Sequence, residues 1–483
     1  MNNYFLSIDQ GTTSSRAILY DDHINQVDFV QKELEQHYPS IGLVEHDANE
    51  IWDSVLYCVE ELMKRNSLSH KDIISIGITN QRETVVAWDK TSGKPAHRAL
   101  VWQDRRTSDY CADLREQGIE TEIRQKTGLL LDPYFSATKI KWLKDSLGEK
   151  EISNLLFGTI DSYLIWKLTN GKKFVTDITN ASRTSLFNIN NCDWDQDLLK
   201  VFGLGSIALA EVKANADNYG ETTLFGGSIK ISGVAGDQQA ALIGQNCFEK
   251  GSIKSTYGTG CFLILNTGEE LIRSKNKLLT TIGYKLDSEV CYALEGSIFM
   301  AGSLIQWLRD QMGILESAED SERKALDADP ESRVFVIPAM TGLGAPHWES
   351  DAKGAIFGLT MGSGQNEISL AALEAVAFQS KELINAMEAD GGKITSLKID
   401  GGMSKNNYFA QILANTIKID ICRPKNIETT ALGAAYLAAL GSGFATKSEI
   451  TNFWQSDKEF EPKESLNKKF DEWQGILKGL IEQ

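Results

Sequence analysis

The sequence has few cysteines, and their spacing excludes a disulfide framework or a zinc site. Its seven cysteines are odd in number and scattered over 483 residues, and no two of them form a CxxC pair. Unpaired thiols of this kind are typical of a reducing compartment. The apolar start, YFLSI, is too short for the core of a secretory signal and has no basic segment before it. We therefore expect a cytoplasmic protein.

Long hydrophobic runs and clusters of positive charge are also missing. No stretch approaches the roughly 20 apolar residues that a membrane-spanning helix needs, so we expect no membrane span. The net charge is −17, and no run of Lys and Arg offers the basic face of a nucleic-acid-binding protein. We expect no nucleic acid partner. An anionic ligand would need a pocket lined by amides or by local cations.

The nucleotide-binding signatures that occur most widely are absent too. No GxxxxGK[ST] motif is present, which excludes a P-loop, and no GxGxxG motif supports a dinucleotide site. If the chain holds a phosphate, another kind of turn must bind it.

What the chain does have is the length and composition of a multidomain globular protein, with 42% hydrophobic and 24% charged residues. Strand-like and helix-like segments alternate, which predicts layered α/β architecture. Strands are expected at residues 4–8, 15–21, 73–80 and 85–89. A helix is expected at 47–66, with Asp47 and Glu50 in capping-box positions. Residues 463–482 have the period of an amphipathic helix that packs on the body.

Two turns rich in glycine and hydroxyl groups are candidates for a phosphate site. Backbone amides and hydroxyls bind phosphate oxygens, and carboxylates hold hydrated Mg²⁺. The first turn, DQGTTS at Asp9–Ser14, follows residues 4–8. A plain hairpin explains it equally well when it is considered alone. The second, STYGTG at Ser255–Gly260, is similar in kind. Together they predict a duplicated architecture, with domains at residues 1–249 and 250–483, and a clamp on one polyphosphate.

Three further strand ends carry candidate residues. Asp237 opens a helix, either as its cap or as a base that accepts a proton from a hydroxyl. Arg82 and Glu83 follow an apolar strand, either as a solvated pair or as donors and acceptors for a polyol. Gly401 and Gly402 follow another strand, where glycine allows a ligand to approach the backbone. Taken alone, the two glycines are more simply a strand-to-helix turn.

Together, the segments resemble the FGGY carbohydrate kinases over nearly the whole chain and in the family's order. The matching segments are DQGTTSSRA, GITNQRET, VWQDRRT, DPYFSATKIKW, TNASRTSLFNI, GVAGDQQAAL, STYGTGCF, EGSIFMAGSLIQWLRD, TGLGAPHW, GAIFGLT and DGGMSKNN. Each is weak alone, but the set is specific. GITNQRE and GDQQAAL are similar to the members that act on glycerol. The resemblance implies two duplicated ribonuclease-H-like domains of the actin-like ATPase type flanking a deep catalytic cleft. It also implies phosphorylation of glycerol by ATP to sn-glycerol 3-phosphate and ADP, in glycerol catabolism.

The resemblance implies a role for each candidate residue. The phosphates of ATP would contact Thr12, Thr13, Ser14, Arg16 and, from the second domain, Thr259. The nucleoside pocket would be lined by Gly302, Gln306, Gly402 and Asn406, and Mg²⁺ would be held through water by Asp9. The hydroxyls of glycerol would be held by Arg82, Glu83, Tyr134, Asp237 and Gln238. Its carbon backbone would be covered by Trp102 and Phe262, and the catalytic base would be Asp237.

Two alternatives stay open at this point: a related kinase for another polyol or a ketosugar, and a non-catalytic nucleotide-binding relative. The family also implies a homodimer or homotetramer. Two of its regulatory features are missing from the residues. The loop at 224–233 is short, with Lys230 as its single cation, and no histidine lies between His97 and His347. We therefore expect neither inhibition by fructose 1,6-bisphosphate nor phosphorylation on histidine.

Overall fold

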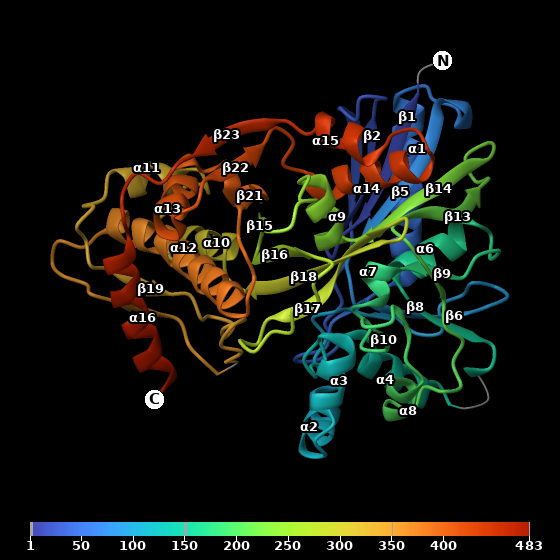
Figure 1. The fold of residues 1–483 in the computed structure, drawn as a ribbon, viewed down its shortest axis with the longest axis horizontal. Helices are drawn as coiled ribbons and strands as arrows, with labels where there is room; N and C mark the ends of the chain where they lie inside the picture. Colours follow the sequence, from blue (N-terminus) through green and yellow to red (C-terminus); the bar gives the residue numbers. More distant parts are fainter. Residues whose placement is uncertain (1–2, 149–151, 350, 483) are drawn as a thin grey trace. The chain divides into compact units, whose positions relative to one another are not determined.

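The computed structural model describes residues 3–148, 152–349 and 351–482, and it divides the chain into two compact units (Figure 1). Unit 1 consists of Met1–Asn246, Thr280–Tyr292 and Thr429–Trp454, and unit 2 of Cys247–Leu279, Ala293–Glu428 and Gln455–Gln483. The division expected at residues 249–250 lies close to the first crossing between the units. Two later segments return to unit 1.

Unit 1 is built around a six-stranded sheet that the opening hairpin begins. Its strands, in sheet order, are β13 (Ala216–Thr222), β14 (Ile229–Gly236), β5 (Ile73–Asn80), β1 (Tyr4–Gln10), β2 (Ser14–Tyr20) and β3 (Gln26–Glu33). β1 pairs antiparallel with β2 and parallel with β5, and β5 pairs parallel with β14. The strands expected at residues 4–8, 15–21 and 73–80 are confirmed.

The other elements of unit 1 are helices and short strands. The helices are α1 (Ala48–Arg65), α2 (Ser108–Glu116), α3 (Glu120–Thr127), α4 (Ser136–Leu147), α6 (Ile160–Leu168), α7 (Ile178–Ala181), α8 (Gln196–Val201), α9 (Asp237–Gly244), α14 (Thr429–Gly441) and α15 (Lys447–Phe453), with a 3-10 turn η1 (His70–Asp72). The strands β4 (Glu45–His46), β7 (Ala99–Leu100), β6 (Val85–Asp89) and β8 (Leu155–Thr159) form a second sheet in that order. Short pairs are made by β9 (Val175–Asp177) with β12 (Glu211–Lys213) and by β10 (Phe187–Asn188) with β11 (Asp193–Trp194).

Helices cover both faces of the six-stranded sheet. Side chains alternate between the faces of a strand. Leu6 and Ile8 of β1 therefore join a buried cluster with α1 and α6, whereas Ser7 donates a hydrogen bond to the carbonyl of Ala431 in α14. The sheet of unit 1 is thus the middle layer of an α/β/α stack.

The predicted start of α1 is confirmed in one part and wrong in another. Asp47 caps the helix by accepting from the amide of Asn49 at 2.8 Å. Glu50 does not complete a capping box; its carboxylate accepts from the amide of Glu35 on the neighbouring segment at 3.0 Å. A tertiary contact has replaced the local one that the spacing suggested.

Glycines allow α14 to lie very close to the sheet of unit 1. A Cβ atom on Gly77 of β5 would lie 2.0 Å from the carbonyl oxygen of Ala434, and one on Gly233 of β14 would lie 2.4 Å from the amide nitrogen of Ala438. Neither contact is sterically possible, so only glycine fits at these two positions. α14 therefore supports β5 and β14 from behind, and both strands carry candidate residues at their ends.

The sheet of unit 2 repeats the strand arrangement of unit 1. Its order is β17 (Leu279–Leu286), β18 (Glu289–Ile298), β16 (Cys261–Gly268), β15 (Ser252–Tyr257), β21 (Ser396–Asp400), β22 (Ile421–Pro424) and β23 (Ser456–Phe460). Nearly all of β17 and the start of β18 belong to the segment Thr280–Tyr292 of unit 1. An antiparallel hairpin, β15–β16, is followed by the parallel strands β21 and β22 and the antiparallel edge strand β23. In unit 1 the same places are taken by β1–β2, β5, β14 and β13. The predicted duplicated α/β architecture is confirmed.

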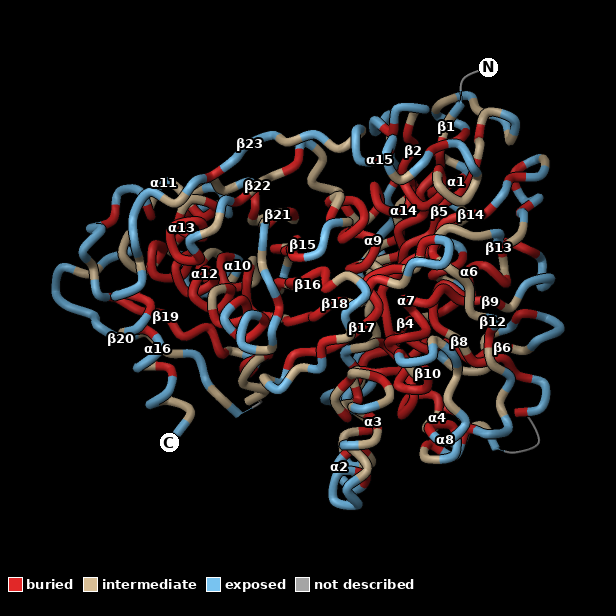
Figure 2. The backbone as a smooth tube through the Cα atoms, in the orientation of Figure 1, coloured by how far each residue is buried: buried red, intermediate tan, exposed pale blue. Residues whose placement is uncertain are grey.

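The remaining elements of unit 2 enclose its own core. They are α10 (Gly302–Asp310), α11 (Asp320–Leu326), β19 (Phe335–Ile337), β20 (Ala355–Phe357), α12 (Gln365–Ala389), η2 (Gly402–Lys405), α13 (Asn407–Ile417) and α16 (Asn467–Ile481). Buried residues, red in Figure 2, follow the central strands and α12. Phe470 and Trp473 of α16 pack against Phe378 of α12, so the expected tail helix packs on the body.

Candidate active site

Residues from separate parts of the sequence meet at one edge of the unit 1 sheet. The adjacent parallel strands β1, β5 and β14 end at Gln10, Asn80 and Gly236. Asn80 lies opposite both Gln10 and Gly236 in the strand pairing. Beyond them the chain enters the first glycine-rich turn, the Arg82–Glu83 pair and Asp237. Open α/β sheets bind ligands beyond the carboxyl ends of their parallel strands. The fold thus brings three predicted candidates to the position where a ligand is expected.

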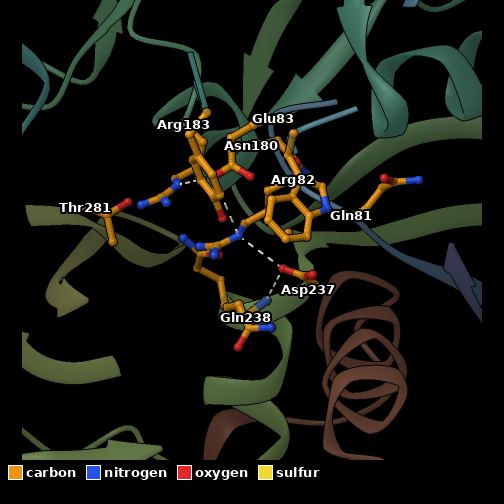
Figure 3. A network of polar contacts seen from close by, with 12 residues as sticks. Gln81, Arg82, Glu83, Asn180, Arg183, Asp237, Gln238 and Thr281 are labelled. Atoms are coloured by element: carbon orange, nitrogen blue, oxygen red, sulfur yellow. Dashed lines mark hydrogen bonds and ion pairs between the residues drawn. The ribbon is translucent and has the colours of Figure 1, made fainter. Parts of the chain in front are cut away.

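Four charged side chains form an alternating row at this edge (Figure 3). The Nε atom of Arg183 lies 2.6 Å from Oε1 of Glu83, and that oxygen lies 3.9 Å from Nε of Arg82. The same Arg82 nitrogen lies 3.1 Å from Oδ1 of Asp237. The first three side chains are at most 2% exposed, whereas that of Asp237 is 31% exposed. Buried charges need compensation, and the row supplies it while leaving one carboxylate accessible.

Glu83 has an unusual backbone conformation. Its φ angle is 61°, in the left-handed region that residues other than glycine rarely adopt. Such strain persists only where the surroundings fix it, and it is frequent at functional sites. The carbonyl of Glu83 accepts from the hydroxyl of Ser136, and its carboxylate from Arg183, so both ends of the residue are held.

The two glutamines that follow Asp237 differ in their contacts. Gln239 is fully buried; its Oε1 accepts from Nη1 of Arg82 at 3.1 Å and its Nε2 donates to the carbonyl of Ile282 at 3.2 Å. The backbone amide of Gln238 donates to Oδ1 of Asp237 at 2.7 Å. Sequence reasoning named Gln238 and missed Gln239 and Arg183. The signal for Arg183 was its place in the matching segment TNASRTSLFNI.

A second, buried polar layer supports the loop that carries Asp237. The hydroxyl of Thr179 accepts from the amide of Gly236 at 3.0 Å and donates to the carboxylate of Asp177. Burial, with the nearby Asp161 carboxylate, raises the pKa of Asp177 to about 7. The residue before Asp237 is therefore anchored by a hydroxyl that is itself held in place.

An aromatic pair borders the charged row. The rings of Trp102 and Tyr134 meet edge to face with centroids 5.4 Å apart, and the Arg183 guanidinium lies 6.0 Å from the Tyr134 ring. Both aromatic side chains are half-buried. A wall of this kind contacts carbon atoms and keeps water out.

Lys139 fixes the segment that carries Tyr134. Its fully buried ammonium donates to the carbonyls of Pro133, Tyr134 and Phe135 at 2.9, 2.5 and 2.9 Å. Burial lowers the pKa of Lys139 to about 7. This lysine was not singled out from the sequence.

The first turn presents hydroxyl groups between β1 and β2. It closes through the amide of Gly11, which donates to the carbonyl of Ser14 at 2.9 Å, and Thr13 is exposed. Asp9 and Arg16 are cross-strand partners and form a 2.5 Å ion pair. The Asp9 side chain is 6% exposed. One carboxylate beside a turn rich in hydroxyl groups fits Mg²⁺, which uses few protein ligands and completes its shell with water and phosphate.

The second turn is the corresponding feature of unit 2. Its Gly258 and Thr259 carbonyls accept from the amides of Gly302 and Ser303 at the start of α10, at 2.9 and 3.0 Å. A Cβ atom on Gly302 would lie 2.5 Å from the Gly258 carbonyl oxygen. The turn and the predicted Gly302 are thus in contact, and the side chain of Thr259 is exposed.

The other unit 2 candidates lie on three further elements. Gln306 is exposed on α10 and Phe262 is half-buried in β16. Gly402 begins η2, after Gly401 at φ 84°. Asn406 accepts from the amide of Phe409 at 2.8 Å and so caps α13. The roles of these side chains toward a nucleoside or glycerol stay predictions.

Among residues 3–148, 152–349 and 351–482, no group of three or more His, Cys, Asp and Glu side chains is arranged to hold a metal ion. Within the same residues, no helix is both long and apolar enough to cross a membrane.

Comparison with known proteins covers both units. Residues 4–244 match the N-terminal domain, and residues 253–442 the C-terminal domain, of the FGGY family of carbohydrate kinases. A glycerol kinase from Rhizobium rhizogenes is 53% identical over 473 residues, which is 96% of this chain and 95% of the relative. One from Bacillus subtilis is 49% identical over 493 aligned residues, covering 100% of this chain and 99% of the relative.

The fold also matches a solved structure over its full length. The crystal structure of Plasmodium falciparum glycerol kinase with ADP has a TM-score of 0.93 and 36% sequence identity to this chain. The match covers 100% of this chain and 99% of that one.

Proposed function

Because this chain belongs to the FGGY family of carbohydrate kinases, we propose that it transfers the γ-phosphoryl group of ATP to glycerol and releases sn-glycerol 3-phosphate and ADP. The observation that carries the proposal is the row of charges ending in Asp237. It offers carboxylate acceptors and guanidinium donors side by side. A small triol needs such paired partners, since an unpaired polar group is costly in a buried site.

In the proposed reaction, Asp237 accepts the proton of the attacking hydroxyl. The hydroxyl oxygen forms a bond to the γ-phosphorus as the bond to the bridging oxygen of ADP breaks, and ADP leaves with that electron pair. The ion pair with Arg82 orients the carboxylate, and the backbone amide of Gln238 holds its Oδ1 in place. Phosphoryl transfer depends mainly on positioning and charge neutralisation, which these contacts supply.

Glycerol would be held by the residues around that base. Arg82, Glu83, Tyr134 and Gln238 would bind its hydroxyl groups, and Trp102 and Phe262 would cover its carbon atoms. The edge-to-face contact of Trp102 with Tyr134 supports a rigid wall on one side. Excluding water matters because water is the competing acceptor.

ATP would be held by the two turns and the nucleoside-binding residues. Thr12, Thr13, Ser14, Arg16 and Thr259 would contact its phosphates, and Gly302, Gln306, Gly402 and Asn406 would line the nucleoside pocket. Asp9 would hold Mg²⁺ through water, and the ion would neutralise phosphate charge when bound. A cytoplasmic location and a homodimer or homotetramer complete the proposal.

The experiment is ADP release from ATP and Mg²⁺ by the purified chain, with glycerol tested beside other polyols and ketosugars. Glycerol should give the highest kcat/KM by a wide margin. A ketosugar that exceeds glycerol would favour a sugar kinase of the same family. ATP binding without any acceptor-stimulated turnover would indicate a nucleotide-binding relative.

A further inference from the structure

The buried side of the first turn is lined by uncharged hydrogen-bonding side chains that the proposed reaction does not use. Gln81 is 1% exposed, and His46 is also 1% exposed. Nε2 of Gln81 donates to Oε1 of Gln10 at 3.0 Å and to the carbonyl of Gly11 at 3.2 Å. Its Oε1 accepts from the hydroxyl of Thr84 at 2.9 Å. Gln81 therefore connects the phosphate-type turn to the segment after β5.

Three residues, Gly11, Thr12 and Thr13, lie between β1 and β2, and the backbone carbonyl of each accepts a hydrogen bond from elsewhere in the protein. The Gly11 carbonyl accepts from Gln10 at 2.7 Å and from Gln81. The Thr12 carbonyl accepts from Gln36 at 3.0 Å. The Thr13 carbonyl accepts from the backbone amide of Leu34 at 2.9 Å. Carbonyl oxygens repel phosphate, so this arrangement leaves the hydroxyl groups of the turn to meet an anion.

The donors and acceptors in this network permit one consistent assignment. Nε2 of Gln36 donates to backbone carbonyls, so its Oε1 must accept from Nε2 of His46 at 2.8 Å. Nδ1 of His46 is then an acceptor 3.4 Å from Nε2 of Gln81. The two protons of that nitrogen already serve Gln10 and Gly11 at shorter distances, so the contact with His46 is a weak, shared one. Burial, with a smaller contribution from His37, lowers the pKa of His46 to about 4. The ring is thus neutral near pH 7, as the assignment requires.

The network continues to the aromatic wall. The hydroxyl of Thr84, which donates to Gln81, accepts from the backbone amide of Trp102 at 3.2 Å. The indole Nε1 of Trp102 donates to Oγ1 of Thr12 at 3.0 Å. Since that oxygen accepts from the indole, the hydroxyl proton of Thr12 points elsewhere and is available to a phosphate oxygen.

We propose that Gln81 is a positioning residue for the phosphate turn and that Trp102 orients the Thr12 hydroxyl as a phosphate donor. The wall against glycerol and the turn for ATP are then one hydrogen-bonded unit. The inference rests on the proposed function for the identity of its ligands. Loss of the Gln81 contacts or of the hydrogen bond from Trp102 to Thr12 disorders the turn that binds the phosphates of ATP. Neither Gln81 nor the indole N–H itself touches ATP.

The test uses Gln81→Met, which keeps the length of the side chain and removes its donors, and Trp102→Phe, which keeps an aromatic wall and removes the N–H. Gln103→Met is the matched control, because Gln103 is exposed next to Trp102. Binding of the non-hydrolysable analogue AMPPNP with Mg²⁺ is measured by calorimetry without glycerol, and melting temperatures identify unfolded variants. This readout does not depend on which acceptor the enzyme uses.

Gln81→Met and Trp102→Phe should each weaken AMPPNP binding about tenfold or more, because the displaced turn or the misoriented Thr12 hydroxyl loses a hydrogen bond to the charged ligand. In steady-state kinetics with glycerol, Gln81→Met should raise KM for ATP and leave KM for glycerol within about threefold. The control should match the wild type. Trp102→Phe combined with Thr12→Val should bind no worse than Thr12→Val alone, because both remove the same contact.

Three results would overturn the inference. The first is AMPPNP binding by Gln81→Met within about twofold of wild type. The second is a double variant, Trp102→Phe with Thr12→Val, whose loss of AMPPNP affinity is the product of the two single losses, and the third is a Gln81→Met variant in which KM rises for glycerol but not for ATP. A wild-type protein without glycerol-stimulated turnover would instead refute the proposed function, and the AMPPNP comparison would still decide the inference.

Discussion

The guanidinium of Arg183 lies 2.6 Å from the carboxylate of Glu83, and both side chains are at most 1% exposed. Glu83 has no solvent to replace that partner, and Arg82 is 3.9 Å away and already paired with Asp237. Arg183 therefore compensates Glu83 at the inner end of the charged row.

Replacing Arg183 by leucine should leave a buried carboxylate without its nearest cation. We expect a loss of about 3–5 kcal/mol in the free energy of unfolding, with a rise in KM for glycerol. Urea unfolding and kinetics measure both. Arg183→Lys, which keeps the charge but not the planar group, should recover part of the stability. Equal stability of the leucine variant and the wild type would contradict the compensation argument.

The close packing of α14 on Gly77 can be tested by a Gly→Ala substitution there, with the same substitution at the open position Gly479 as a control. A Cβ atom on Gly77 would overlap the Ala434 carbonyl, whereas one on Gly479 of α16 would have no atom within 4 Å. Gly77→Ala should cost about 3 kcal/mol or more through overpacking. Gly479→Ala should stabilise by about 1 kcal/mol, because alanine is the better helix former. Thermal unfolding measures both signs, and a neutral Gly77→Ala would show that α14 moves away freely.

The buried pair of Glu374 and Lys469 predicts a pH-dependent variant in unit 2. Lys469 Nζ lies 2.6 Å from Oε1 of Glu374, and burial raises the pKa of that carboxyl to about 7, while Lys469 opposes the rise. The folded pKa lies above the unfolded value of about 4.3. The folded chain therefore holds a proton that the unfolded chain has lost, and stability falls as the pH rises through this window.

Lys469→Met should raise the pKa of Glu374 further and steepen that fall. We expect the variant to cost about 3–5 kcal/mol at pH 8, where the carboxylate is charged and unpaired. At pH 5, where the carboxyl is protonated, it should cost about 1–2 kcal/mol. Glu374→Gln in the same background should remove most of the pH dependence. A Lys469→Met cost that is the same at both pH values would contradict this assignment.

Fructose 1,6-bisphosphate should not inhibit the enzyme at physiological concentration. A bisphosphate needs several cationic or amide donors, and the loop at 224–233 has Lys230 as its single cation. Turnover with glycerol and ATP should be unchanged across a titration of the bisphosphate. Inhibition at physiological concentration would show that donors from elsewhere complete a site.

Much of the fold could be predicted from local patterns. The alternation of apolar strands and helices indicated the α/β layers, and the two glycine-rich turns indicated the repeat that the two sheets confirm. Glu50 was misread because its partner, the amide of Glu35, lies on another segment. Local spacing carries no information on such a contact.

The candidate site was predictable where residues sit directly at strand ends, as Arg82, Glu83 and Asp237 do. Arg183 and Gln239 were missed because their roles come from tertiary contacts with Glu83 and Arg82. Arg183 lies in the turn after α7, and Gln239 is the second glutamine of a helix. Neither has a local pattern that separates it from a surface residue, and the segment TNASRTSLFNI is the one signal that marked Arg183.

The most direct test of the account is kcat and glycerol affinity of Asp237→Asn. The amide keeps the shape of the side chain but cannot accept the proton, so kcat should fall by about 10²–10⁴-fold, with glycerol affinity within a few-fold of wild type. A melting temperature near that of the wild type would show that the fold is intact. A kcat close to the wild-type value would contradict the account, since Asp237 would then be only a helix-terminal partner of Arg82.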